Sequence, residues 1–125
     1  MNLLEKVALL EREAAEFGFQ WETTGQIMAQ IKSECVEIVE HLQLPHEGNR
    51  LDLQEEIGDL LHAVFSLCVF CQFSPEETLS RTLDKFDRRL QAVKGIALEN
   101  KLDGLQGMPF DELMAIWDEA KRRVG

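Results

Sequence analysis

Apolar side chains recur every three or four residues along most of the chain, which is the spacing of one face of an α-helix. No segment alternates between apolar and polar residues as a strand does. The pattern therefore predicts an all-α fold, a bundle of four to five helices. The expected helices cover residues 2–16, Thr23 or Thr24 to about Leu44, about Leu51 to Gln72, Pro75 to at least Ala97, and Pro109 to about Arg123.

The interruptions of this pattern contain residues that end or begin helices. Pro45, Gly48 and Asn49 predict one loop, and the stretch Gly104–Gly107 predicts another. Ser74 followed by Pro75 and two glutamates is typical of a capped helix start. The second half of the helix before it is apolar on most of its circumference. Such a helix is enclosed by other helices or by a partner subunit, so we expect oligomerisation to complete the bundle.

A length of 125 residues and a mass of 14.3 kDa predict one domain spanning residues 1–125. Hydrophobic residues make up 45% and charged residues 29%, which is typical of a globular protein and not of a disordered one. The net charge of −10 argues against a nucleic-acid polymer as partner, because that affinity comes mainly from cationic side chains. A small anionic substrate would need a bound cation or a local basic patch.

The cysteines and the apolar runs predict a cytoplasmic protein without a membrane anchor. Three cysteines cannot all pair, and a chain of this length does not depend on disulfides. The spacing Cys68-x-x-Cys71 lies inside an apolar helix with no second pair, so we expect both to be buried as small hydrophobic side chains. The longest nearly apolar run, Leu60 to Phe70, is too short to cross a bilayer, and no export signal is visible.

Two acidic pairs are the first candidates for chemistry, Glu34 with Glu37 and Glu56 with Asp59. A spacing of three residues places both members of a pair on one helical face. Such pairs are common in a chain this rich in acids, and most are simply solvated. Their positions are more informative, because Glu34 lies at the margin of the apolar stripe of its helix and Asp59 lies in a narrow polar strip on an otherwise apolar helix. That strip also contains Glu55, His62 and Ser66, with Glu56 one step round.

If these two helices pack antiparallel, the four carboxylates converge at a partly buried site. Four negative charges together are unfavourable unless protons or a cation compensate them. Carboxylate oxygens without a cysteine or histidine set favour Mg²⁺, with Mn²⁺ as a possible substitute. The pattern therefore predicts a divalent-metal site on these two helices.

Basic and aromatic residues near the end of the chain could meet a phosphate-containing substrate. Lys85 and Arg89 lie one turn apart beside an apolar stripe, and Lys121 lies one turn after Trp117. Such cations can hold phosphate oxygens, and an indole can stack on a base. The structural alternative is that the cations cover apolar surface with their stems and that the Trp belongs to the core.

Five short motifs, taken together, resemble those of the MazG-type nucleoside triphosphate pyrophosphohydrolases. They are FGFQW at 17–21, Glu34-x-x-Glu37, Glu56-Ile-Gly-Asp59-Leu-Leu, Lys85-Phe86-Asp87-Arg88-Arg89 and Trp117-x-x-x-Lys121. They occur in this order, and the similarity runs from about residue 7 to residue 122. The chain looks most like the C-terminal half of full-length MazG.

This resemblance implies an all-α enzyme that cleaves nucleoside triphosphates between the α- and β-phosphates in the presence of Mg²⁺. The metal ligands and catalytic residues would be Glu34, Glu37, Glu56 and Asp59. The phosphates would contact Lys85 and Arg89, and the substrate pocket would be completed by Trp117 and Lys121. Members of the family typically form dimers or dimers of dimers, which implies the same partner for this chain.

Three alternatives remain open from the residues alone. A helical oligomerisation or adaptor module would use the acids only as a solvated face. A carboxylate-bridged di-iron protein is suggested by Asp59-x-x-His62, although a second such motif is missing. A pyrimidine-selective relative acting on dUTP or dCTP would be a variant of the pyrophosphohydrolase.

Overall fold

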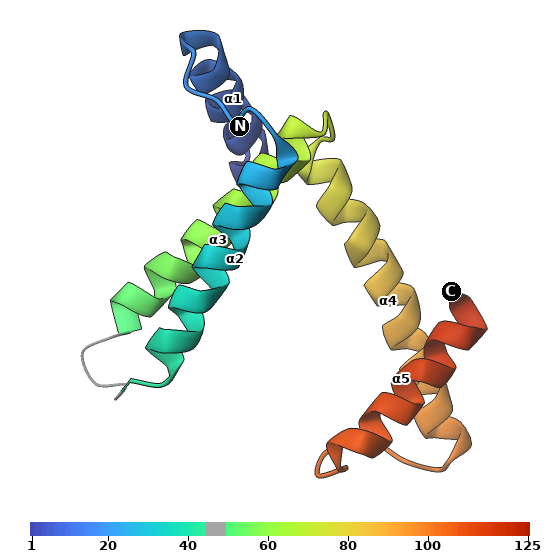
Figure 1. Cartoon of the computed structure of the whole chain (residues 1–125). Coiled ribbons are helices and arrows are strands. Elements are labelled where there is room, and N and C mark those ends of the chain that lie inside the picture. Colours follow the sequence, from blue (N-terminus) through green and yellow to red (C-terminus); the bar gives the residue numbers. More distant parts are fainter. Residues whose placement is uncertain (45–49) are drawn as a thin grey trace. The chain divides into compact units, whose positions relative to one another are not determined.

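The computed structural model describes residues 1–44 and 50–125, and it confirms the all-α prediction (Figure 1). The described residues form five helices and no strand. The predicted loop residues Pro45, Gly48 and Asn49 lie outside the described residues. The helices are α1 (Leu3–Phe17), α2 (Thr24–Leu42), α3 (Arg50–Phe70), α4 (Pro75–Glu99) and α5 (Phe110–Val124).

Side-chain caps fix the starts of the first two helices. Asn2 Oδ1 accepts a hydrogen bond from the backbone N–H of Glu5 at 2.8 Å, and the Glu5 carboxylate accepts one from the N–H of Asn2 at 3.3 Å. Thr23, and not Thr24, caps α2, since its Oγ1 accepts from the N–H of Gln26 at 3.1 Å. These bonds satisfy backbone donors that have no partner inside the helix.

The boundary between α3 and α4 follows from two local features. Gln72 has a φ of 67°, a left-handed conformation that cannot continue a helix, so α3 ends at Phe70 and not at the predicted Gln72. Ser74 Oγ then accepts from the N–H of Glu77 at 3.1 Å, as the sequence predicts for the start of α4.

The expected burial of the cysteine pair is wrong for Cys71, which follows the end of α3 and is exposed.

The chain divides into two compact units, Met1–Thr78 and Leu79–Gly125. The boundary falls inside α4, so this continuous helix belongs to both units. That residues 1–125 act as one domain stays a prediction.

The charges are distributed unequally between the two units. Unit 1 contains fifteen of the 23 acidic residues and only four of the thirteen Lys and Arg residues.

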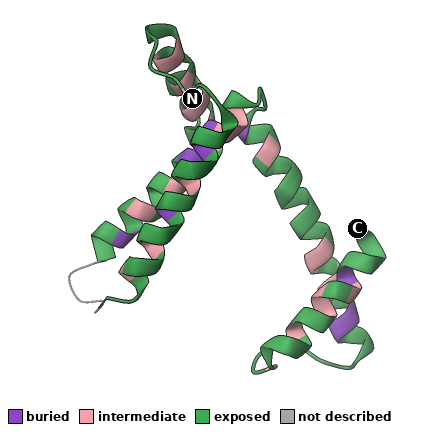
Figure 2. Ribbon diagram, viewed as in Figure 1, coloured by how far each residue is buried: buried purple, intermediate pink, exposed green. Residues whose placement is uncertain are grey.

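Unit 1 is built around α3, which contacts both α2 and α1. α2 and α3 run antiparallel beside each other (Figure 1). Ile27 of α2 is completely buried, and Leu53 and Ala63 of α3 are also buried (Figure 2). Glu11 connects α1 to α3, because its Oε1 accepts from Ser66 Oγ at 2.6 Å and lies 2.8 Å from His62 Nε2. His62 and Ser66, two members of the predicted polar strip of α3, therefore bind α1 through Glu11.

Unit 2 consists of the rest of α4 and of α5. Ile96 and Ala97 of α4 are buried, as is Ala120 of α5 (Figure 2). Arg123 of α5 forms a bidentate salt bridge with Glu99 of α4, with both N···O distances at 2.9 Å. The ion pair between Arg123 and Glu99 joins the two helices of unit 2.

Many large apolar residues are exposed. Most of the ribbon in Figure 2 has the colour of exposed residues. On α3, which was expected to be enclosed, Leu61 is 55% and Val64 is 40% exposed. The other helices of unit 1 therefore do not enclose α3, and its enclosure by a partner subunit stays a prediction.

In the described part of the chain no single helix is long and apolar enough to cross a membrane; only the pair α3 and α4 taken together meets that criterion of length and composition.

Candidate active site

The acidic pairs lie on the two helices that pack most extensively in unit 1. Glu34 is on α2, one turn after Gln30 and two turns after the buried Ile27. It is only 7% exposed, whereas Glu37 and Asp59 are exposed. The sequence placed Glu34 at the margin of the apolar stripe, and the packing of α2 on α3 buries that margin.

The two carboxylate oxygens of Glu34 have different surroundings. Oε1 accepts a hydrogen bond from Gln30 Nε2 at 2.7 Å. Oε2 is inaccessible to solvent and has no hydrogen-bond partner among the described residues. An unpartnered buried carboxylate oxygen is costly, so it requires an explanation.

Burial is the main cause that raises the pKa of Glu34, and the neighbouring Glu37 is the next. The negative charge of Asp59 raises this pKa further, while the hydrogen bond from Gln30 lowers it. Glu37 of α2 and Asp59 of α3 are thus both close enough to Glu34 to act on it electrostatically. A proton or a cation would relieve this repulsion.

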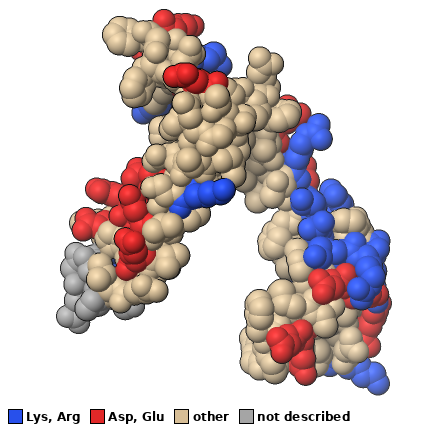
Figure 3. All heavy atoms as spheres, viewed as in Figure 1, with Lys and Arg blue, Asp and Glu red and all other residues tan. Residues whose placement is uncertain are grey.

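The fourth acid, Glu56, lies on α3 and reaches a different residue of α2. Its Oε2 lies 2.7 Å from His41 Nδ1, and both side chains are 20% exposed. This contact also joins α2 to α3 and fixes one oxygen of Glu56. Figure 3 shows acidic side chains gathered over the α2–α3 part of unit 1.

The described residues contain no group of three or more His, Cys, Asp or Glu side chains already arranged to hold a metal ion. The donor set nevertheless fits Mg²⁺, since it offers hard carboxylate oxygens and one of them, Glu34 Oε2, is buried without a partner. Mg²⁺ is usually held by one or two carboxylates together with waters and substrate phosphates. A complete protein cage is therefore not required.

The predicted substrate-binding residues belong to unit 2, and the structure brings two of them together. The guanidinium carbon of Arg89 lies 5.7 Å from the ring centroid of Trp117, and Phe86 packs on the same indole with centroids 5.9 Å apart. Arg89 Nε also donates to the carbonyl oxygen of Gly125 at 2.8 Å. Trp117 is partly buried, in agreement with the core alternative.

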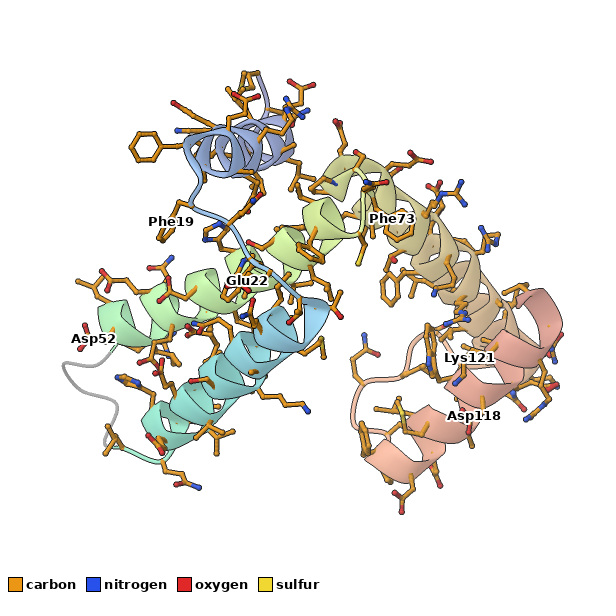
Figure 4. The ribbon with its side chains drawn as sticks, turned by 45° about the horizontal axis from the view of Figure 1, so that its top comes forward. Phe19, Glu22, Asp52, Phe73, Asp118 and Lys121 are labelled. Atoms are coloured by element: carbon orange, nitrogen blue, oxygen red, sulfur yellow. The ribbon has the colours of Figure 1, made fainter. Side chains whose placement is uncertain are left out.

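The two predicted lysines are exposed. Lys121 Nζ lies 3.5 Å from Asp118 Oδ1, one turn back on α5 (Figure 4). An exposed ion pair of this kind contributes little to stability, so the ammonium group can exchange its partner readily. Lys85 lies one turn before Arg89 on α4 and leaves its ammonium group at the surface.

Two contacts of the acidic site were not predicted from the sequence. Gln30 lies four residues before Glu34, a spacing at which helical side chains meet, so this pair could have been found. His41 and Glu56 are on different helices, and their contact depends on how the helices pack. Both residues hold one oxygen of a predicted metal ligand.

Comparison with known proteins links these observations to a family. The chain is 26% identical over 120 residues to a nucleoside triphosphate pyrophosphohydrolase of Escherichia coli K12, covering 96% of this chain and 45% of that protein. It is 29% identical over 112 residues to the nucleoside triphosphate pyrophosphohydrolase/pyrophosphatase MazG of Thermotoga maritima, covering 90% of this chain and 41% of that protein. The chain thus spans less than half the length of either relative.

The profile of the MazG nucleotide pyrophosphohydrolase domain matches residues 22–94. This range includes both acidic pairs together with Lys85 and Arg89, and it ends before Trp117 and Lys121. Since it covers more than half of the residues, the all-α chain with its acidic α2–α3 pair belongs to the MazG nucleotide pyrophosphohydrolase family.

Proposed function

We propose that this chain hydrolyses nucleoside triphosphates between the α- and β-phosphates in a Mg²⁺-dependent reaction, giving a nucleoside monophosphate and pyrophosphate. The observation that carries the proposal is Glu34, a buried carboxylate with an unpartnered oxygen beside the charges of Glu37 and Asp59. Such a group is stable when a cation lies next to it. The names of the relatives from Escherichia coli and Thermotoga maritima support the same reaction.

The four acidic residues Glu34, Glu37, Glu56 and Asp59 would hold the metal. Bound Mg²⁺ supplies positive charge that offsets the carboxylates and the triphosphate and polarises the phosphoryl group. Glu37 is exposed, so it can orient an attacking water and accept its proton. The new bond joins the water oxygen to the α-phosphorus, and the bond from that phosphorus to the bridging oxygen breaks as pyrophosphate leaves.

The substrate-binding residues that we propose are basic and aromatic side chains of unit 2. Lys85 and Arg89 are one turn apart on α4, so both cations can contact phosphate oxygens. Trp117, which already has Arg89 over its ring, and Lys121 would also contact the substrate. The free Cys35, Cys68 and Cys71 agree with a cytoplasmic location, where thiols are kept reduced.

A panel of nucleotides tests the proposal directly. The four ribonucleotides, the four deoxynucleotides, dUTP and several modified triphosphates are compared under one Mg²⁺ concentration, with the products identified. We expect pyrophosphate and the monophosphate in equal amounts, and no product after chelation of the metal. Orthophosphate with a diphosphate would contradict the cleavage site. Absence of any hydrolysis, with no effect of Mg²⁺ on thermal stability, would favour an adaptor module.

A second copy of the chain is the partner that we propose for this enzyme. Leu61 and Val64 of α3 and Leu83 and Phe86 of α4 are exposed, and large apolar side chains in such numbers are typical of a surface that is covered by a partner. Sedimentation equilibrium at micromolar concentration should give a dimer or a dimer of dimers. A monomeric mass across the accessible concentrations would contradict this proposal and leave the hydrolytic one intact.

A further inference from the structure

The hydrogen bond between Gln30 and Glu34 distinguishes the two oxygens of a buried carboxylate. Gln30 Nε2 donates to Oε1 at 2.7 Å, while Oε2 is buried and has no partner among the described residues. Both residues lie on α2, one turn apart, so the contact is independent of how other elements pack. Only one oxygen of Glu34 is therefore already satisfied by the protein.

An amide donor orients a carboxylate without neutralising its charge. A lysine at this position would form an ion pair and compete with a bound cation, whereas Gln30 leaves the full negative charge in place. Glu34 is 7% exposed and its Oε2 is inaccessible to solvent, so bulk water does not compensate the charge on that second oxygen. The side-chain amide thus fixes the rotation of the carboxylate and leaves the second oxygen available.

We infer that Gln30 is a positioning residue of the metal site, which holds Glu34 through Oε1 so that Oε2 is presented to the divalent cation. The inference rests on the proposed function, because it needs Glu34 to be a metal ligand. Residues that orient metal ligands through a hydrogen bond typically contribute 10- to 100-fold to metal affinity, so about a tenfold effect is expected here.

The test uses the whole chain with Gln30→Met, which keeps the length of the side chain and removes the donor. Free Mn²⁺ is measured by electron paramagnetic resonance in the absence of nucleotide. We expect the dissociation constant for Mn²⁺ to rise about tenfold, and the Mg²⁺ concentration for half-maximal hydrolysis to rise similarly. The value of kcat at saturating Mg²⁺ should change less than about twofold, because Gln30 does not touch the reacting atoms. A merely structural role would lower the melting temperature without moving the metal dependence.

Two further variants separate failure of this inference from failure of the proposed function. Gln54→Met replaces another exposed helical glutamine, on α3, and should leave Mn²⁺ binding unchanged. Glu34→Gln should lose binding. If Gln30→Met binds Mn²⁺ as tightly as the unmodified protein, or more tightly, while Glu34→Gln loses binding, the positioning role is wrong and the metal site stands. If the unmodified protein neither binds Mn²⁺ nor shows Mg²⁺-dependent hydrolysis, both are wrong.

Discussion

Replacement of Glu37 by Gln, or of Asp59 by Asn, should reduce pyrophosphate release at least about a hundredfold while the helices stay folded. Loss of a positioned general base alone typically costs two to four orders of magnitude. Both side chains are exposed, so neither substitution creates a cavity or an unpartnered buried group. Each also removes a charge that raises the pKa of Glu34. We therefore expect melting temperatures equal to or above that of the unmodified protein.

Matched substitutions exist on the same two helices. Glu40→Gln removes an exposed acid of α2 one turn after Glu37, and Asp52→Asn removes one from the first turn of α3. Both controls should retain activity within a fewfold, because a change in overall charge alters mainly the encounter with an anionic substrate. Full activity of Glu37→Gln or Asp59→Asn, measured by pyrophosphate release with helicity followed by circular dichroism, would remove these residues from the catalytic site.

The helices could be predicted from the sequence because their signals are local. A period of 3.6 residues and capping side chains such as Thr23 and Ser74 act within one or two turns. Where a helix end differs from its prediction, the reason is equally local. The helix α3, for example, ends before Gln72, which has a left-handed conformation. The division into two units was not predictable, since its boundary lies inside the continuous helix α4, where no loop residue marks it.

The acidic site was predictable only in part. The spacing of each pair placed its two acids on one helical face, and the structure brings Glu34, Glu37 and Asp59 within electrostatic reach. The contact between His41 and Glu56, and that between Glu11 and Ser66, join helices whose packing the spacing does not determine. Periodicity gives the face of a helix, whereas the partner across the interface depends on the crossing angle and register of two helices.

Glu34→Gln should stabilise the metal-free protein near neutral pH and abolish its stabilisation by divalent metal. The amide can keep its oxygen toward Gln30 and turn its NH₂ group toward the position of Oε2, where Glu37 and Asp59 place negative charge. A buried polar group left unpaired costs about 1–3 kcal/mol, so relief of that cost should raise the melting temperature by several degrees. Mg²⁺ or Mn²⁺ should raise the melting temperature of the unmodified protein only, because binding to the folded state alone stabilises it.

The difference in stability between Glu34→Gln and the unmodified protein should depend on pH. This dependence distinguishes removal of the Glu34 charge from a change in packing. Since the pKa of Glu34 is raised in the folded state, its carboxyl group stays protonated there at pH values where the unfolded chain has ionised. The stability that the proton provides is complete below the ordinary carboxyl range and is lost as the pH rises through the raised pKa. The advantage of Glu34→Gln should therefore be small in acid and grow as the pH rises through the raised pKa of Glu34. Denaturant titrations at a series of pH values, with Glu40→Gln as the control for removal of one charge, measure this difference. A difference that does not vary with pH, or a variant that is less stable at neutral pH, would mean that the Glu34 carboxylate is already compensated without metal.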